Sequence, residues 1–387
     1  MRKNIYLFNI YHLLSGLWLF SPLAVIYFQE VCNSYTTAIL AYSLINLTQS
    51  ISEVPLGVLS DRNGRKTNLC ISAVLLCLNM ICWAIAGVGG GVWMLFLGSV
   101  LRGVGISFMT GTDAAFLYET MADLRRKKLF DKVYAKAMSY NQLGLLLSAI
   151  CATIVTFYLP LIWLAWLSVL PTIGLIICTS LFKEPKSNFD ENLSPWAQMK
   201  KSFWLLLKRK KLRSYTAMRV LSSGLVLSIY RYEILYYAQL IATYLITIVR
   251  IIMHLSGYIS FLLVPMVRRF NFLQLLFLSS LGAAIVRGIA VVINNSLTPF
   301  LSAFANLSYG VGVTAQTTLL QKEYNKSLRA TMHSLSDFLC GFAVTIIGYL
   351  YGLMADYTSP RVALSVAIGV QVIIAMLYKQ LFRIYKK

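Results

Sequence analysis

Besides Arg219, four arginines of this chain lie inside long apolar segments: Arg102, Arg231, Arg250 and Arg287. An ionised arginine is costly in such a segment unless it is paired or hydrated, so intramembrane arginines commonly mark functional sites. The planar guanidinium carries donors in a fork that matches the oxygens of a carboxylate or a phosphate. We therefore expect these arginines to bind a small anionic solute.

The acids of the same apolar segments are candidates for carrying a proton. Asp113 follows Arg102 by about three helical turns, so a continuous helix would place both side chains on one face. A buried carboxyl group can hold a proton near neutral pH. We expect Asp113 and Glu233 to be the proton-coupling residues.

A purely structural use of these charges is the alternative. The arginines of the second half can pair with Glu233 and Asp337, and Arg219 can extend its side chain to the aqueous boundary. Arg102 can likewise donate to backbone carbonyls and hold neighbouring helices together. The sequence leaves both uses open.

A short charged turn separates two of the apolar segments, from Gly57 to Lys66. Its glycines permit close helix approach and a tight turn. The glycines and charged residues of this turn follow the spacing G-x-x-x-D-R-x-G-R-K. A further acid, Glu119, lies near the end of a later apolar segment and could pair with the basic residues of the turn. The candidate residues of this turn and its partner acid are Gly57, Asp61, Arg62, Gly64, Arg65 and Glu119.

The spacing of this turn resembles the loop between the second and third helices of the major facilitator superfamily, a large class of secondary transporters. The resemblance implies a cytoplasmic gate in which Asp61 and Arg65 form charge contacts with Glu119 as a third partner. It also implies a functional arginine at the place of Arg102, although Ile106 stands where the family often has glycine. A turn that only anchors topology through its charges is the alternative.

Apolar runs long enough to cross a bilayer recur through the chain, which is 58% hydrophobic and only 13% charged. About 20 helical residues cross the hydrocarbon layer. The sequence predicts an all-α polytopic membrane protein with twelve transmembrane helices in two pseudo-symmetric six-helix bundles. The predicted spans are 5–28, 36–59, 66–86, 92–121, 132–158, 161–181, 213–236, 240–267, 272–293, 297–320, 329–355 and 360–383.

The basic residues alternate between the two sides of this topology. Of the 35 lysines and arginines, 29 fall on one side, and Arg361 alone falls in the opposite loops. The positive-inside rule then places both termini in the cytoplasm. This distribution explains the net charge of +21 without nucleic acid as a partner.

The longest polar stretch divides the chain into two halves. We predict an N-terminal six-helix bundle over 1–181, a cytoplasmic linker over 182–212 and a C-terminal bundle over 213–387. Within the linker, apolar residues recur at helical spacing beside Lys208–Lys211, which indicates either an amphipathic helix on anionic inner-leaflet lipids or a solvated linker. An offset of 207 residues lays Arg102–Ser107 over Tyr309–Thr314, which indicates internal duplication.

These observations predict a proton-coupled secondary transporter of the bacterial inner membrane, working by alternating access as a symporter or an antiporter. Its substrate would be a small polar, anionic solute such as a carboxylate-rich metabolite or a siderophore. A drug exporter is the alternative, although residues 139–150 of the fifth span lack the Gly-Pro run that the resemblance would imply for such exporters. We expect the protein to be a monomer. We also expect that it is not an enzyme and that it uses no cofactor or metal, since nucleotide motifs, metal-ligand spacing and cofactor motifs are absent from the sequence.

Overall fold

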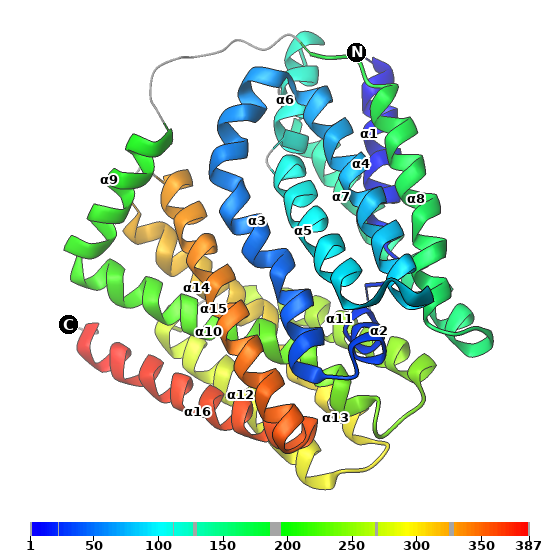
Figure 1. Cartoon of the computed structure of the whole chain (residues 1–387). Helices are drawn as coiled ribbons and strands as arrows, with labels where there is room; N and C mark the ends of the chain where they lie inside the picture. Colours follow the sequence, from blue (N-terminus) through cyan, green and yellow to red (C-terminus); the bar gives the residue numbers. More distant parts are fainter. Residues whose placement is uncertain are drawn as a thin grey trace. The chain divides into compact units, whose positions relative to one another are not determined.

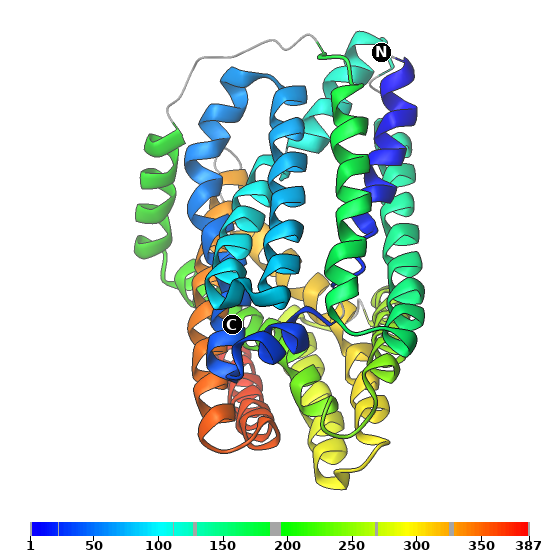
Figure 2. The same ribbon diagram turned by 45° about the vertical axis from the view of Figure 1, so that its right-hand side comes forward.

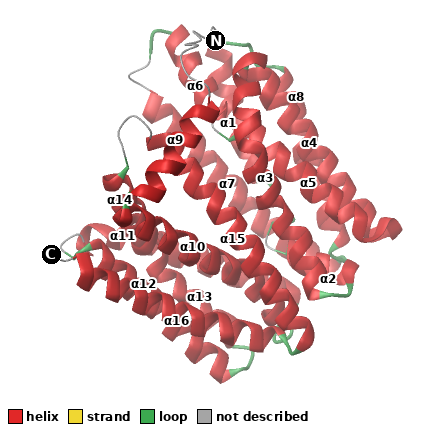
Figure 3. Ribbon diagram, turned by 60° about the vertical axis from the view of Figure 1, so that its left-hand side comes forward, coloured by secondary structure: helices red, strands yellow, loops and turns green. Residues whose placement is uncertain are grey.

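The computed structural model describes residues 2–21, 23–110, 112–126, 130–185, 195–267, 270–324 and 329–385. Helices and loops make up all of this described part (Figure 3). The chain forms two compact units (Figure 1). Unit 1 comprises 1–33 and 41–195, and unit 2 comprises 34–40 and 196–387.

Unit 1 is built from eight helical pieces. α4 packs against α5 and α8, and α1 packs against α7. The pieces are α1 (Arg2–Gly16), α2 (Ala24–Cys32), α3 (Tyr35–Asn63), α4 (Arg65–Ile85), α5 (Gly91–Met109), α6 (Thr112–Asp123), α7 (Phe130–Tyr158) and α8 (Ile162–Ser180). A π-helical turn, Ala86–Gly90, joins α4 to α5.

Unit 2 repeats this packing. α12 packs against α16, as α4 does against α8, and α10 packs against α15, as α1 does against α7. Its helices are α9 (Pro195–Lys208), α10 (Lys210–Tyr237), α11 (Thr243–Val267), α12 (Phe272–Ile293), α13 (Thr298–Ala303), α14 (Tyr309–Glu323), α15 (Arg329–Tyr357) and α16 (Pro360–Tyr385). A 3-10 turn, Phe304–Ser308, joins α13 to α14.

Paired glycines give the duplication a structural basis. A Cβ on Gly103 would lie 2.5 Å from the Ile45 carbonyl oxygen of α3, and one on Gly310 would lie 2.6 Å from the Phe261 nitrogen of α11. Two residues later, Gly105 faces α4 and Gly312 faces α12. The two G-x-G segments therefore place their helices against equivalent neighbours, at the 207-residue offset seen in the sequence.

The predicted spans correspond to these helices, but three spans are interrupted. The first is divided between α1 and α2, which run in different directions (Figure 2). The fourth breaks after Met109, where Thr110 takes a non-helical ψ of 122°, and the tenth contains the 3-10 turn. The expectation of continuous helices is wrong at these places, because apolar character fixes span length while local contacts decide whether the helix continues.

In the part of the chain that the structure describes, seven segments are long and apolar enough to cross a membrane, the first of them running across residue 111: 65–123, 136–158, 162–180, 243–261, 272–293, 335–357 and 360–385. Large apolar side chains on their outer surfaces are exposed, among them Ile154, Ile177, Ile285 and Ile289. Extended apolar surface of this kind fits contact with lipid. The chain is a multi-pass membrane protein.

The start of α3 is held by a residue from the end of α15. The two oxygens of the Asp356 carboxylate accept hydrogen bonds from the backbone N–H groups of Tyr35 and Thr36, at 2.7 and 2.8 Å. The Ser34 hydroxyl donates to the same carboxylate at 3.0 Å. This cap satisfies donors that the first turn of a helix leaves without a partner. It also explains why residues 34–40 group with unit 2.

Candidate functional site

A fully buried carboxylate lies between two buried guanidinium groups in unit 2. Glu233 of α10 is 3.5 Å from Nε of Arg287 on α12 and 4.0 Å from Nη1 of Arg250 on α11. All three side chains are buried. One acid between two bases leaves an excess of positive charge when all three are ionised. We name Glu233, Arg250 and Arg287 the buried triad.

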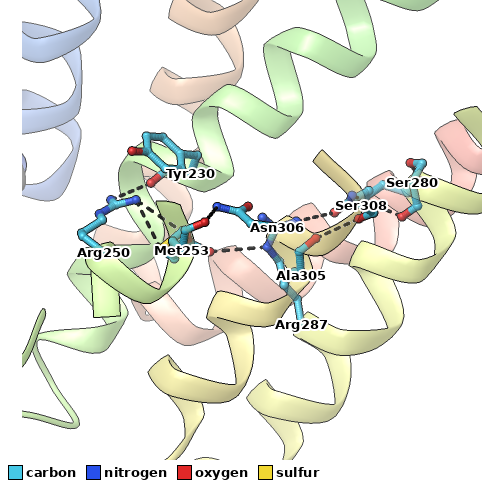
Figure 4. Close-up of polar contacts among 10 residues, drawn as sticks. Tyr230, Arg250, Met253, Ser280, Arg287, Ala305, Asn306 and Ser308 are labelled. Carbon is cyan, nitrogen blue, oxygen red and sulfur yellow. Dashed lines mark hydrogen bonds and ion pairs between the residues drawn. The ribbon is translucent and has the colours of Figure 1, made fainter. Parts of the chain in front are cut away.

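Neighbouring groups fix both guanidinium groups of the buried triad. Arg250 donates to the Tyr230 carbonyl at 2.7 Å, and its guanidinium lies 4.3 Å from the centre of the Tyr230 ring. A weaker contact joins Arg250 to the Met253 sulfur (Figure 4). Arg287 donates to Gln371 of α16 at 3.5 Å. The arginine forks are thus oriented from several helices, which favours a defined binding geometry.

Figure 4 also shows how the irregular tenth span joins this region. The Asn306 amide donates to the Met253 carbonyl at 3.3 Å, and the Ser308 hydroxyl donates to the Ala305 carbonyl. Both donors belong to the 3-10 turn or its end, where main-chain bonding departs from the α-helical pattern. The interruption therefore brings polar groups to α11, close to Arg250.

Arg231 is half-buried on α10, two positions before Glu233. Residues two apart on a helix point about 200° apart, so Arg231 and Glu233 lie on different faces of α10. Elsewhere on α10, Arg219 pairs with Asp337 of α15 at 2.5 Å. The structure thus contains internal pairing at Glu233 and at Asp337, which is the alternative raised by the sequence.

In unit 1, Arg102 lies among aromatic side chains. Its guanidinium is 3.5 Å from the centre of the Trp18 ring and 5.8 Å from that of Trp83. It also donates to Asn79 at 3.4 Å. Trp18 stands in the interruption between α1 and α2, so the break in the first span places an indole on the guanidinium. Cation–π stacking of this kind stabilises a cation that has been removed from water.

Asp113 pairs with a histidine. It lies in the first turn of α6, directly after the break in the fourth span, and its carboxylate is 3.9 Å from Nε2 of His12. The same carboxylate accepts from the Ala114 N–H at 2.7 Å. Both residues are largely buried, and their separation is that of an ion pair and longer than a hydrogen bond. Thr110 interrupts the helix between Arg102 and Asp113, so the continuous helix that their common face requires does not form.

The charged turn of unit 1 contains a close ion pair between Arg65 and Glu119. Nε of Arg65 donates to Glu119 at 3.2 Å, and both side chains are mostly buried. Gly64 takes a φ of +83°, which favours glycine at this position. Gly57, Asp61 and Arg62 lie near the end of α3, but the structure does not describe their side-chain surroundings, so the role of these three residues stays a prediction.

Glu184 also contacts the charged turn, and it was not among the residues that the sequence singled out. Its two carboxylate oxygens accept from the backbone N–H groups of Arg65 and Lys66, at 2.6 and 2.8 Å. Glu184 therefore caps α4, which carries no acid in its own first turn. Two features of the sequence could have suggested this contact. The first turn of α4 contains no acid, and a glutamate follows shortly after the sixth span.

Comparisons with known proteins agree with this arrangement. The sequence profile of the Major Facilitator Superfamily matches residues 13–349. The inner membrane transport protein YajR of Escherichia coli (strain K12) is 27% identical over 139 residues, which are 36% of this chain and 29% of that protein. This match thus spans less than a third of the length of that relative.

Solved structures match over nearly the whole chain. The nucleoside transporter NupG superposes with a TM-score of 0.81 at 14% identity, with 98% of each chain covered. A D-xylose-proton symporter superposes with a TM-score of 0.70 at 15% identity, with 97% of this chain and 96% of that chain covered. At such low identity these structures show the shared fold.

Proposed function

The chain belongs to the Major Facilitator Superfamily and is a secondary transporter of small molecules, and we propose that its substrate is a small organic anion carried together with protons. Carboxylate-rich metabolites and siderophores are the substrate classes that fit best. The transporter works in the bacterial inner membrane by alternating access, with both termini in the cytoplasm. The sidedness of the basic residues supports this orientation.

The buried triad is the observation that carries the proposal. Two guanidinium groups lie beside one carboxylate, that of Glu233. A carboxylate of the substrate is the same chemical group, so it could pair with the two arginines in the way that Glu233 does. When Glu233 takes up a proton, its negative charge is lost and both arginines are left to a bound anion. One proton and one singly charged anion then enter together, so the net charge of the triad with its bound anion is unchanged. The triad thus links proton uptake to anion binding.

Unit 1 supplies further residues for the cycle. Asp113 with His12 forms a second proton-accepting pair, and Arg102 on its aromatic support offers another guanidinium to the substrate. Arg231 is the fourth proposed substrate contact. The Arg65–Glu119 pair, together with Asp61, forms the cytoplasmic gate, whose contacts hold one state of the transporter closed.

Arg250→Gln is expected to weaken binding of the anionic substrate by about tenfold to hundredfold, the loss of one charge-assisted contact. Isothermal titration of the purified protein, after a thermal-shift screen of anionic metabolites, siderophores and cationic drugs, measures the change. Arg250→Lys tests the geometry of the guanidinium, because lysine keeps the positive charge but lacks the two parallel N–H donors. Arg361→Gln is the matched control, since Arg361 donates to the Val291 carbonyl outside the triad.

Unchanged anion affinity in Arg250→Gln would refute the role of the triad. Binding of cationic drugs by the parent protein, together with no binding of anions, would instead favour the drug exporter.

Asp113→Asn is expected to abolish uptake driven by a pH gradient in proteoliposomes while exchange of labelled for unlabelled substrate continues. The amide cannot take up the proton, but the substrate contacts remain. Asp123→Asn, at the other end of α6, is the matched control and should keep driven uptake. Driven uptake at the parent rate in Asp113→Asn would exclude Asp113 from coupling. A channel would show no exchange-accelerated uptake in any variant.

A further inference from the structure

Helix α9 exposes apolar and basic side chains on one short segment. Phe203, Trp204 and Leu207 are 45%, 55% and 40% exposed. At helical spacing these three share one face, within about 100° of each other. Exposed cations surround this face or follow it at the end of the helix: Lys200, Lys201, Lys208, Arg209 and Lys210.

The apolar face of α9 finds no large partner in the described part of the protein. The extensive helix contacts of unit 2 are made among the helices from α10 through α16, and α9 takes no part in them. Leu206 is the buried apolar residue near its end, and it lies on a different face from Trp204. The exposed aromatic side chains therefore need an apolar environment that these helices do not supply.

The chain bends sharply at the end of α9. Arg209 takes an extended conformation, with φ −89° and ψ 101°, and α10 starts at Lys210 (Figure 1). Leu212 and Tyr215 of α10 are buried within the first turns. Because α10 contains the seventh span predicted from the sequence, 213–236, its first residues are expected at the membrane boundary. The bend therefore places the end of α9 at that boundary.

The cations near the bend have separate roles. Lys211 forms an ion pair with Glu323 at 2.6 Å, and its hydrogen bond with Glu323 raises the pKa of the Lys211 ammonium. This pair joins the start of α10 to the end of α14. Lys208, Arg209 and Lys210 form no ion pair with the residues that the structure describes, and their exposed side chains can reach outward.

We propose that α9 is a peripheral membrane helix that binds anionic phospholipid headgroups. Phe203, Trp204 and Leu207 insert at the level of the headgroups, as the aromatic and apolar faces of interfacial helices do. The surrounding cations select anionic over zwitterionic lipid, because each one near the surface adds to the attraction. An acidic soluble partner would meet the charges but leave the indole and phenyl rings in water.

Quenching of tryptophan fluorescence by brominated lipid tests this assignment in the full-length protein in nanodiscs. The signal of Trp204 is the difference between the parent and Trp204→Phe. Brominated phosphatidylglycerol is expected to quench this signal about twofold more than brominated phosphatidylcholine at the same mole fraction. Trp93→Phe is the matched control, because Trp93 is also exposed but lies on α5, away from this basic segment.

Combined substitution of the five cations around the apolar face of α9 by Gln should remove the preference for phosphatidylglycerol. The substitution pair Arg2→Gln and Lys3→Gln, at exposed positions of α1, should retain it. Equal quenching by both lipids in the parent would overturn the selection of anionic lipid. A Trp204 signal that neither lipid quenches, but that soluble acrylamide does, would show a solvated linker and overturn the proposal entirely. Both readouts are independent of the transported substrate.

Discussion

Glu233→Gln is expected to lower the free energy of unfolding of the purified protein by about 3–5 kcal/mol, the cost of removing one partner from a buried ion pair. Without the carboxylate, Arg250 and Arg287 face each other in the core of unit 2 with no compensating charge. Thermal unfolding in detergent, followed by tryptophan fluorescence and by helical circular dichroism, measures the loss.

A double substitution separates charge balance from simple damage to packing. Glu233→Gln with Arg287→Gln removes one negative and one positive charge, and it should recover part of the stability that Glu233→Gln alone loses. Glu30→Gln is the matched control, because Glu30 is a glutamate at the boundary of the first span and does not belong to the triad. Parental stability in Glu233→Gln would mean that an ionised Glu233 does not stabilise the arginines.

Gly144→Val is expected to prevent stable packing of α1 on α7 and to yield little monodisperse protein. A Cβ on Gly144 would lie 2.3 Å from the Leu13 carbonyl oxygen, and one on Gly16 would lie 2.3 Å from the Asn141 carbonyl oxygen. Overpacking of a core typically costs about 1–3 kcal/mol, and more where the obstacle is backbone that cannot move aside. Gly144→Ala should show a smaller loss in the same direction.

Gly282→Ala is the control for Gly144, since no atom beyond its chain neighbours and its own helix backbone lies within 4 Å of the position where its Cβ would be. Alanine is favoured over glycine inside a helix by about 1 kcal/mol, so this substitution should keep or raise the unfolding temperature. Size-exclusion profiles and thermal unfolding of both variants give the comparison. Equal behaviour of Gly144→Val and Gly282→Ala would contradict the tight approach of α1 and α7.

The helices of the fold could be predicted from the sequence because hydrocarbon imposes a simple rule. Every spanning segment must satisfy its own backbone hydrogen bonds, so apolar length identifies helices and their ends. The turn expected near Tyr237 lies where α10 ends. The interruptions at Thr110 and at Phe304–Ser308 could not be predicted in this way, because both lie inside predicted spans whose apolar length gives no sign of a break.

The individual residues of the candidate site could be predicted from the sequence, but their convergence in space could not. Arg250, Arg287 and Glu233 each stand out as charges within apolar segments, but their convergence depends on the packing of three helices. Arg65 and Glu119 do contact each other, while their gating role stays a prediction.

His12 and Trp18 illustrate the limit of reasoning from charge alone. A lone histidine and a lone tryptophan in the first span carry no pattern of their own. Their contacts with Asp113 and Arg102 follow from the breaks in the first and fourth spans. Only the three-dimensional arrangement of these breaks shows which neighbours each polar residue meets.

The Asp356 cap means that cutting the linker would not separate the chain into two self-sufficient pieces. The first turn of α3, residues 34–40, groups with unit 2, while the same helix from Ala41 onward groups with unit 1. A fragment ending at residue 195 would keep the donors of Ser34, Tyr35 and Thr36 but lose the carboxylate that accepts from them. Complementation between separately expressed halves would therefore restore a helix cap whose carboxylate comes from the second half.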